Sequence, residues 1–265
     1  MRQTLIVDEF TSGVLTDAFA PNGRVAVYED QDLRWEITNL PMTYDAALAP
    51  DGTCWVSLIR ERAVWRVDRA GQPLQKVPVG GYPCSLQLLS SGNVLVAGWD
   101  DDVPGFVREY EPTGRLTWQL DNLRWPWKAE RLPDGQTLVA DAGTNEVFAV
   151  DEAGQHVWTA AGLGPIEPAL FDKLGPVYCQ RLANGHTLVS IRSLDRVVEL
   201  DGAGREVWTV PAGVLTAPYS ATRLPDGHTL VADNGHKRVV ELNEAGQPIW
   251  ELTGFGYIAK AYRLD

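Results

Sequence analysis

Six polar residues occupy one equivalent position in a repeated stretch of the chain, and together they could do chemistry. Counted back from the turn glycine of each repeat, they are Asp45, Ser85, Lys128, Tyr178, Ser220 and Lys260. In a chain with a formal net charge of -12, two lysines facing each other across a channel mouth could hold a carboxylate, sulfate or phosphate. A lysine desolvated among aromatic rings could also have a lowered pKa and act as a base. The candidate catalytic residues are therefore Lys128, Lys260, Tyr178 and Asp45.

The same two lysines have a second interpretation, as charge partners of acidic residues in neighbouring repeats. Asp45 is expected one repeat away from Lys260, and the acidic run 100–102 is expected one repeat away from Lys128. Lysines close to acidic loops are usually charge partners of those loops, so the sequence favours this interpretation.

Aromatic residues that break the repeat form the second candidate site. Trp99 precedes the acidic run, "RWPW" (124–127) follows another strand, and most other connections on the same face carry an aromatic residue. Such a platform could stack a sugar or an aromatic ligand, whereas the alternative is that the rings fill gaps between structural units. With two serines and a histidine of the same face, the candidate ligand-binding residues are Trp99, Trp125, Trp127, Tyr44, Tyr82, Tyr219, Ser85, Ser220, Tyr257 and His236.

Three aspartates are weak candidates for a cation site. Asp8, Asp141 and Asp233 each end the second predicted strand of a repeat, so their carboxylates could bind a divalent cation such as calcium at the channel mouth. The alternative is that each carboxylate accepts hydrogen bonds from the amides of its own following turn. Neighbouring repeats would hold the carboxylates too far apart for joint ligation, so no metal and no other cofactor is predicted.

The elements that would position these residues follow from the repeat itself. A turn containing glycine precedes a strand at "APDG" (49–52), "SSG" (90–92), "LPDG" (132–135), "LANG" (182–185) and "LPDG" (224–227). The glycines at 52, 92, 135, 185 and 227 are 40, 43, 50 and 42 residues apart. A period of roughly 40 to 50 residues with four short apolar runs is typical of a β-propeller blade. In the last full repeat the strands are expected over 219–224, 228–233, 238–243 and 248–253.

The two ends of the chain predict how the blades are completed. The end "AYRLD" (261–265) matches the first strand of a repeat, and the start "QTLIVDEF" (3–10) matches the second strand. A C-terminal strand that joins the N-terminal strands would close the ring and remove exposed sheet edges. The predicted fold is therefore all-β, a single six-bladed β-propeller domain over 1–265 with four-stranded antiparallel blades. Blade boundaries are expected near 44–83, 84–126, 127–176, 177–218, 219–257, and 258–265 together with 1–43.

Residues that recur from blade to blade are predicted to be structural. A tryptophan starts the fourth strand and is expected to pack between blades at Trp35, Trp118, Trp158, Trp208 and Trp250. An arginine recurs in the first strand, where ion pairs between blades are expected, at Arg131, Arg181, Arg223 and Arg263. The positions that differ between blades are therefore the better guide to function.

The string "RLPDGHTLVADNGHKRVVELNEAGQPIWEL" (223–252) resembles the repeats of NHL, PQQ-like and arylsulfotransferase-like propellers. The resemblance implies the propeller fold, and because such repeats occur in enzymes, sensors and scaffolds it implies no single activity. Arylsulfotransferases use histidines near the channel, but here His186 and His228 follow turn glycines on the opposite face. The pattern A-x-D-x-x-G-x-x-x-W at 149–158 is similar to the tryptophan-docking motif of PQQ enzymes but one residue short, so PQQ is not predicted.

Composition argues against several classes of partner. The 35 acidic residues against 23 Lys and Arg would repel a nucleic-acid backbone. No apolar run approaches the roughly 20 residues of a membrane span. The start MRQTLIVDEF has no signal-peptide core, so a cytoplasmic location is expected, although a trimmed secreted protein would look the same. Reduced, buried thiols are expected at Cys54, Cys84 and Cys179, and the chain is expected to be a monomer or a weak oligomer.

Three functions remain open from the sequence. The first is a binding module that holds a small molecule, glycan or peptide at the channel mouth, on the face where loops converge. The second is a hydrolase, lyase or isomerase that uses the candidate catalytic residues at the same place. The third is a protein-interaction scaffold in which Trp99 and the expanded segment 161–178 contact a partner.

Overall fold

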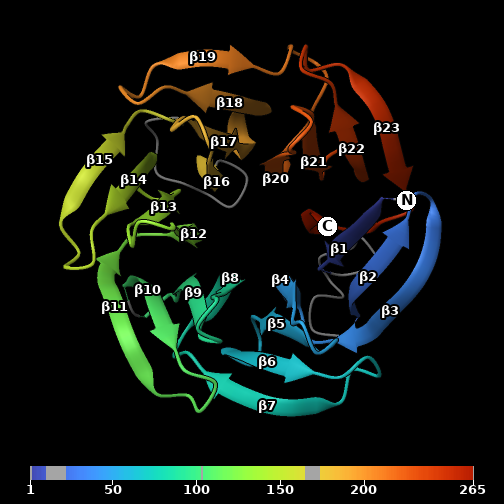
Figure 1. The fold of residues 1–265 in the computed structure, drawn as a ribbon, viewed down its shortest axis with the longest axis vertical. Coiled ribbons are helices and arrows are strands. Elements are labelled where there is room, and N and C mark those ends of the chain that lie inside the picture. Colours follow the sequence, from blue (N-terminus) through green and yellow to red (C-terminus); the bar gives the residue numbers. More distant parts are fainter. Residues whose placement is uncertain (1, 10–21, 103, 165–173, 265) are drawn as a thin grey trace. The chain divides into compact units, whose positions relative to one another are not determined.

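The computed structural model of the chain describes residues 2–9, 22–102, 104–164 and 174–264. These residues form six four-stranded antiparallel sheets, which are the blades of the predicted six-bladed β-propeller (Figure 1). The chain divides into two compact units, residues 1–123 with 254–265 and residues 124–253, and each unit contains three blades. Among the residues described, no helix is long and apolar enough to cross a membrane.

Unit 1 contains blades 1, 2 and 6, each listed from its inner to its outer strand. Blade 1 consists of β4 (Thr43–Leu48), β5 (Cys54–Leu58), β6 (Ala63–Val67) and β7 (Pro73–Pro78). Blade 2 consists of β8 (Tyr82–Leu88), β9 (Val94–Trp99), β10 (Gly105–Tyr110) and β11 (Leu116–Leu123). Blade 6 consists of β24 (Ile258–Leu264), β1 (Gln3–Asp8), β2 (Gly23–Glu29) and β3 (Asp32–Leu40).

Unit 2 contains blades 3, 4 and 5, which are consecutive in sequence. Blade 3 consists of β12 (Pro126–Arg131), β13 (Thr137–Asp141), β14 (Glu146–Val150) and β15 (His156–Ala160). Blade 4 consists of β16 (Pro176–Arg181), β17 (Thr187–Ile191), β18 (Arg196–Leu200) and β19 (Glu206–Thr209), with a short 3-10 helix, η3 (Arg192–Leu194), between β17 and β18. Blade 5 consists of β20 (Pro218–Arg223), β21 (Thr229–Asp233), β22 (Arg238–Leu242) and β23 (Pro248–Thr253).

The sheet of blade 6 confirms the predicted pairing of the chain ends. β24 lies antiparallel to β1, with Ile6 opposite Ala261 and Val7 opposite Lys260. β24 begins at Ile258 rather than at residue 261 as predicted. Residues 10–21, between β1 and β2, lie outside the described residues.

The turns between first and second strands take the form that their glycines predict. In blade 5 the Leu224 N–H donates to the His228 carbonyl at 2.8 Å, and the Gly227 N–H donates to the Leu224 carbonyl at 3.0 Å. Gly227 has a φ of 86°, which glycine adopts without strain. Blade 4 repeats both bonds between Leu182, Gly185 and His186. Equivalent turn residues are therefore held in equivalent places in the two blades.

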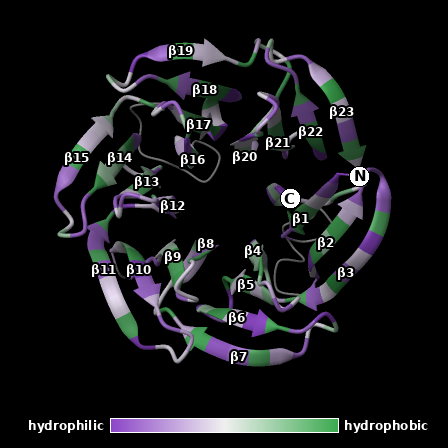
Figure 2. Ribbon diagram, viewed as in Figure 1, coloured by the Kyte–Doolittle hydropathy of each residue, from purple (hydrophilic) through white to green (hydrophobic). Residues whose placement is uncertain are grey.

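Apolar side chains of neighbouring blades form the core, and two of the repeated tryptophans contribute to it as predicted. Trp158 packs against a cluster shared by blades 3 and 4, and Trp208 packs against a cluster shared by blades 4 and 5. Their indole N–H groups donate to the next blade, to the Gly202 carbonyl at 3.0 Å and to the Glu244 carbonyl at 2.8 Å. The outer strands β15, β19 and β23 are largely exposed and mix hydrophilic with hydrophobic residues (Figure 2).

All three cysteines are free and buried, as predicted. Burial raises the pKa of both the Cys54 and the Cys84 thiols to about 12. These two thiols therefore stay protonated at neutral pH and act as small apolar side chains.

Candidate functional site

The inner strand of every blade is irregular at the position that the sequence analysis singled out. A β-bulge adds an unpaired residue and re-aims the side chains around it, and bulges are common beside functional sites. The register shifts lie between Thr43 and Asp45, Pro83 and Ser85, Pro126 and Lys128, Pro176 and Tyr178, Pro218 and Ala221, and opposite β24 between Val7 and Asp8. All six polar side chains at this position are buried, namely Asp45, Ser85, Lys128, Tyr178, Ser220 and Lys260.

In unit 1 the buried carboxylate of Asp45 connects three blades. Its Oδ1 accepts hydrogen bonds from the Tyr262 hydroxyl at 2.7 Å and from the Ala46 N–H at 2.8 Å. Its Oδ2 accepts a hydrogen bond from the Leu86 N–H at 3.0 Å. Since Tyr262 belongs to blade 6 and Leu86 to blade 2, Asp45 holds the inner strands of unit 1 together.

Lys260 lies in a buried group of charges in unit 1. Burial is the main cause of the raised pKa of the Cys84 thiol, and the positive charge of Lys260 partly opposes it. The carboxylates of Glu9 and Asp45 are also close enough to raise that pKa. This arrangement supports the interpretation of Lys260 as a charge partner of acidic residues.

In unit 2 the same position takes part in one of two contacts between a cation and an aromatic ring of an inner strand. The Lys128 ammonium lies 5.3 Å from the centroid of the Tyr178 ring, and the Lys128 residue is only 6% exposed. The Trp127 and Tyr219 rings are 6.1 Å apart, and the Arg192 guanidinium lies 5.1 Å from the Tyr219 ring. We call these five residues, Trp127, Lys128, Tyr178, Arg192 and Tyr219, the inner cluster of unit 2.

The other predicted aromatic residues divide by burial. Tyr44, Trp99, Trp127 and Tyr219 are buried, whereas Tyr82, Trp125 and Tyr257 are partly exposed. In blade 2 the Tyr82 and Trp99 rings pack edge to face at 5.5 Å. Burial of four rings agrees with the alternative that aromatic residues fill gaps between and within blades. The expanded segment 161–178 lies in part outside the described residues, at 165–173.

The three aspartates that end second strands hold backbone amides of loops. Asp141 accepts hydrogen bonds from the N–H groups of Arg124, Trp125 and Gly143 at 2.8–2.9 Å. Asp8 accepts from the N–H groups of Gly256 and Tyr257 at 3.1 and 2.7 Å, and Asp233 accepts from the Thr216 N–H at 2.8 Å. Most of these amides belong to the loop before the inner strand, because that loop ends opposite the end of the second strand.

His236 is the one predicted ligand-binding residue with an exposed side chain, at 44%. Its Nδ1 lies 2.8 Å from Asp233 Oδ2, and its Nε2 lies 3.5 Å from the Thr216 hydroxyl. The Asp233 carboxylate also binds Arg238 Nε at 2.9 Å. His236 thus contacts Asp233, the aspartate that holds the loop before the inner strand of blade 5.

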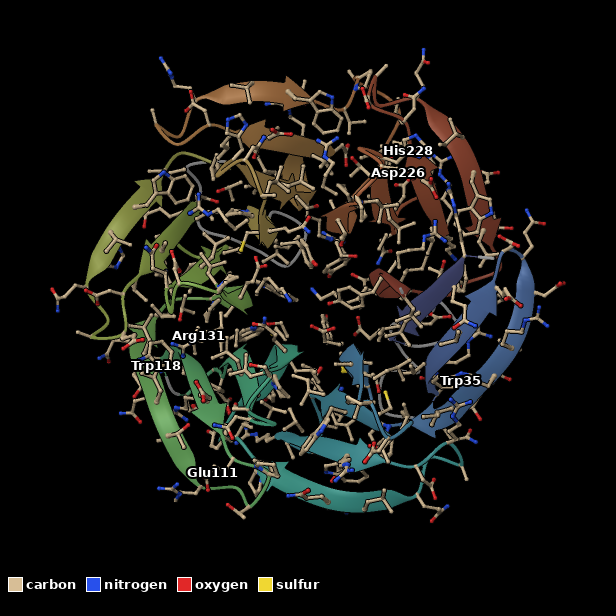
Figure 3. All side chains as sticks on the ribbon, viewed as in Figure 1. Trp35, Glu111, Trp118, Arg131, Asp226 and His228 are labelled. Atoms are coloured by element: carbon tan, nitrogen blue, oxygen red, sulfur yellow. The ribbon has the colours of Figure 1, made fainter. Side chains whose placement is uncertain are left out.

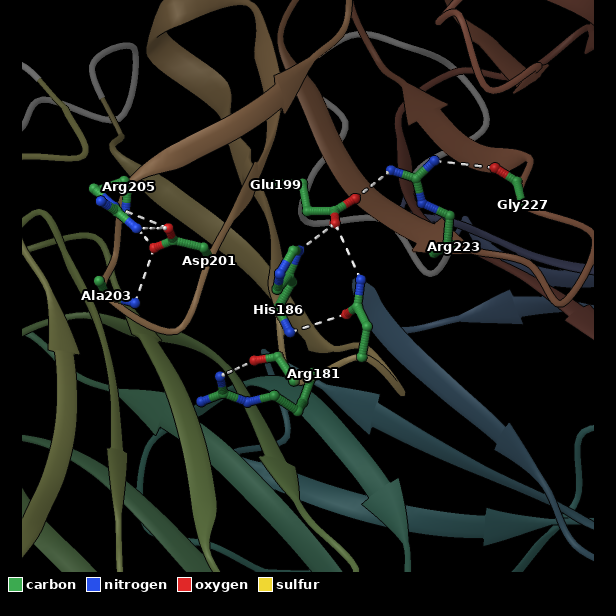
Figure 4. Close-up of polar contacts among 10 residues, drawn as sticks. Arg181, His186, Glu199, Asp201, Ala203, Arg205, Arg223 and Gly227 are labelled. Carbon is green, nitrogen blue, oxygen red and sulfur yellow. Dashed lines mark hydrogen bonds and ion pairs between the residues drawn. The ribbon is translucent and has the colours of Figure 1, made fainter.

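A groove of about 550 Å³ between blades 4 and 5 was missed by the sequence analysis. Arg223 lines this groove, and its guanidinium lies 4.4 Å from the centroid of the Trp208 ring and 2.9 Å from Glu199 Oε2 (Figure 4). Arg181 packs in the same way 4.7 Å from the Trp158 ring. Burial lowers the pKa of both guanidinium groups from their usual value, and both stay charged at neutral pH. Arg223 therefore forms the predicted ion pair between blades.

The sequence analysis also missed three potential metal ligands in blade 5. Asp226, His228 and Glu241 each offer one ligand atom, and the three atoms lie within 4.8 Å of one another. Asp226 and His228 flank the turn glycine and lie side by side (Figure 3). The pairing of β21 with β22 brings Glu241 to them, which the spacing along the chain does not reveal.

Comparison with protein families gives one match. The model of a family described as outer membrane protein assembly factor BamB matches residues 104–255, which is more than half of the chain. No curated protein matches the chain.

Several solved structures share the fold. A protein of unknown function from Bacteroides caccae is 20% identical with a TM-score of 0.75, covering 99% of this chain and 98% of that one. A chain of a nidogen/laminin complex is 12% identical with a TM-score of 0.71 and the same coverage of 99% and 98%. Virginiamycin B lyase from Staphylococcus aureus is 12% identical with a TM-score of 0.59, covering 80% of this chain and 69% of the lyase. At these identities the similarity shows the fold alone.

Proposed function

This chain belongs to the family described as outer membrane protein assembly factor BamB, and from that membership we propose that it acts by binding rather than by catalysis. The family description names an assembly factor. The lyase among the structural relatives shares the fold, and its activity does not extend to this chain. The proposed ligand is a small anion with a planar or aromatic part, and the proposed site is the inner cluster of unit 2.

The observation that carries this proposal is the pair of cations set against aromatic rings. Lys128 is 6% exposed, so burial has removed most of the water around its ammonium group and strengthens its attraction to anions, the nearby Glu130 carboxylate included. The rings of Tyr178 and Tyr219 lie 5.3 Å from Lys128 Nζ and 5.1 Å from Arg192 Cζ. Rings and cations together suit a carboxylate that carries an aromatic group. Arg192 is only partly buried, so solvent reaches part of this residue.

The test is calorimetric titration of the full chain with benzoate and with benzamide, which has the same shape but no charge. A probe of this size is expected to bind with a Kd of roughly 1 mM, and the neutral probe at least about tenfold more weakly. The variant Lys128→Met should weaken benzoate binding by about tenfold or more, since it keeps the side-chain volume and removes the charge.

Lys76→Met is the matched control, because Lys76 Nζ also lies against a ring, 3.8 Å from the Trp65 centroid, but on an outer strand. This variant should bind benzoate as the unmodified chain does. The proposal is contradicted if Lys128→Met and the unmodified chain bind benzoate with equal affinity. It is also contradicted if the unmodified chain binds benzamide and benzoate with equal affinity.

A second candidate function is a protein-interaction scaffold, favoured by exposed apolar residues on the outer strands of unit 2. Val157, Val207 and Ile249 lie next to the structural tryptophans and are 50%, 53% and 48% exposed. The family description suggests an unfolded outer-membrane protein as the probe. The unmodified chain should slow its aggregation after dilution from urea, and a triple change of these residues to glutamate should abolish the effect. An unchanged aggregation rate with the unmodified chain would exclude this function.

A further inference from the structure

The first hairpin of blade 5 ends in a corner formed by Asp226, His228 and Glu241, which we call the turn corner. Asp226 Oδ1 accepts the His228 N–H at 3.1 Å, a bond that fixes the turn. The other oxygen of Asp226, Oδ2, lies 3.4 Å from His228 Nδ1. The same His228 Nδ1 lies 2.8 Å from Glu241 Oε1. Three electron-pair donors therefore converge on one point.

The corresponding corner of blade 4 is made of Asn184, His186 and Glu199. Asn184 Oδ1 accepts the His186 N–H at 3.0 Å, as Asp226 does in blade 5. The atom that replaces Asp226 Oδ2 is the amide Nδ2, which donates to Glu199 Oε1 at 3.5 Å. His186 Nδ1 lies 2.7 Å from the same oxygen, and Arg223 pairs with the other oxygen at 2.9 Å. The Glu199 carboxylate of blade 4 therefore accepts hydrogen bonds from an amide and a guanidinium group.

The difference between the corners is one of charge and of donor type. Where blade 4 has an amide that donates, blade 5 has a carboxylate oxygen that can only accept. Two carboxylates and an imidazole then face one another, and the Glu241 side chain is only 1% exposed. Carboxylates brought together in such a place favour a cation between them.

We propose that Asp226 Oδ2, His228 Nδ1 and Glu241 Oε1 bind a divalent transition-metal ion, with Zn²⁺ as the ion of best fit. One imidazole nitrogen and two carboxylate oxygens form a set that zinc accepts. Tetrahedral zinc places its ligand atoms roughly 3.3 Å apart, given bonds of about 2.0–2.1 Å. The 3.4 Å between His228 Nδ1 and Asp226 Oδ2 already suits this geometry. The 2.8 Å contact with Glu241 needs only to lengthen by a few tenths of an ångström when the metal replaces the shared proton.

Three protein ligands leave one position of a tetrahedral ion open. The Asp226 and His228 side chains are 44% and 26% exposed, so solvent or a ligand can reach that position. Such an open position is typical of zinc sites that bind or activate a ligand rather than serve structure alone.

The test is titration of the full chain, prepared without a histidine tag and dialysed against a chelator, with ZnCl₂ by calorimetry. One equivalent is expected to bind. Co²⁺ in its place should give the visible absorption of tetrahedral cobalt. The variant Asp226→Asn copies the corner of blade 4 and should weaken Zn²⁺ binding by about tenfold or more, and His228→Gln should do the same. Both altered side chains are partly exposed, so the fold should persist, which circular dichroism checks.

The matched change is Asn184→Asp in blade 4, which gives that corner the same three donors and should add a second, weaker Zn²⁺ site, since Arg223 already pairs with Glu199, while the affinity of the site in blade 5 stays unchanged. The proposal is overturned if the unmodified chain binds no zinc at micromolar concentration. It is also overturned if Asp226→Asn and His228→Gln both bind zinc as the unmodified chain does, since the ion would then lie on other carboxylates.

Discussion

Blades 4 and 5 of unit 2 are two copies of one frame whose chemistry differs at single positions. Both have the same strand order, the same turn glycines and the same stacking of tryptophan on arginine at the inter-blade contact. At the turn corner, Asn184 in blade 4 becomes Asp226 in blade 5. At the end of the second strand, Ile191 in blade 4 becomes Asp233 in blade 5. The repeat thus keeps the backbone fixed, and individual side chains give each blade its own interactions.

The largest expected effect comes from Asp233, which holds the loop before the inner strand of blade 5. Blade 4 has no such carboxylate, because Ile191 occupies the equivalent position. Asp233→Asn should lower the free energy of unfolding by about 3 kcal/mol, because it removes the buried carboxylate that pairs with Arg238 and leaves that arginine only the exposed carboxylate of Glu251. It also weakens the bond of 2.8 Å to the Thr216 N–H. Urea unfolding followed by tryptophan fluorescence measures the loss.

Asp195→Asn is the control for this prediction, because Asp195 holds the next amide of the same loop. Its Oδ1 accepts the Ala217 N–H at 2.7 Å from an exposed position in blade 4. The expected loss is below about 1 kcal/mol. Equal losses in the two variants would show that burial of Asp233 adds nothing to the bond.

The second effect concerns the arginines that stack on tryptophan. Arg223→Met should lower the free energy of unfolding by about 2 kcal/mol, because it removes the ion pair with Glu199 at 2.9 Å as well as the contact with the Trp208 ring. Arg181→Met should lower the free energy of unfolding by only about 1 kcal/mol. Ala149 occupies the position in blade 3 that Glu199 occupies in blade 4, so the main interaction that this variant loses is the contact with the Trp158 ring. The measurement is again urea unfolding.

A double-mutant cycle of Arg223→Met with Glu199→Gln isolates the ion pair. A coupling of about 1 kcal/mol or more is expected, since both side chains are less than one-fifth exposed. A coupling near zero would mean that the stacking on Trp208 accounts for the whole effect of Arg223, and the two arginines would then be equivalent.

The repeat made the fold predictable, because every blade needs the same turns and the same packing residues. Gly227 requires its positive φ wherever the turn occurs, and the matching ends of the chain predicted the pairing of β24 with β1. In blade 5 each predicted strand boundary lies within one residue of the observed one. Counting back from the turn glycine also led, in the five repeats that have one, to a position at or beside the bulge of the inner strand.

The site residues were less predictable, because they depend on contacts between strands. His228 and Glu241 are far apart in sequence and meet diagonally, since Leu230 rather than His228 pairs with Glu241. Asp233 and Asp141 were expected to bind the amides of their own following turns, and most of the backbone amides that they bind lie instead in the loop before the inner strand. Burial of Trp127 and Tyr219 follows from their contact across two blades, which no local pattern contains.

The smallest expected effect extends the comparison to blade 3. Glu130 Oε2 in blade 3 accepts the Arg181 N–H at 3.0 Å, and Gln180 Oε1 in blade 4 accepts the Arg223 N–H at 2.7 Å. Burial raises the pKa of Glu130 above its ordinary value of 4.5, against the opposing effect of the bond to Arg181. A raised carboxyl pKa favours folding at low pH, and that contribution is lost as the pH rises through the pKa of the folded state.

Glu130→Gln removes this loss while keeping an acceptor, so it should stabilise the chain by up to about 1 kcal/mol at pH 8 and by nothing at pH 4. The reverse change, Gln180→Glu, should destabilise blade 4 at pH 8 and not at pH 4, and unfolding in urea at the two pH values measures both. If the stability difference between Glu130→Gln and the unmodified chain does not change with pH, glutamate and glutamine are interchangeable at this contact. Blades 3 and 4 would then not differ in what this position contributes to stability.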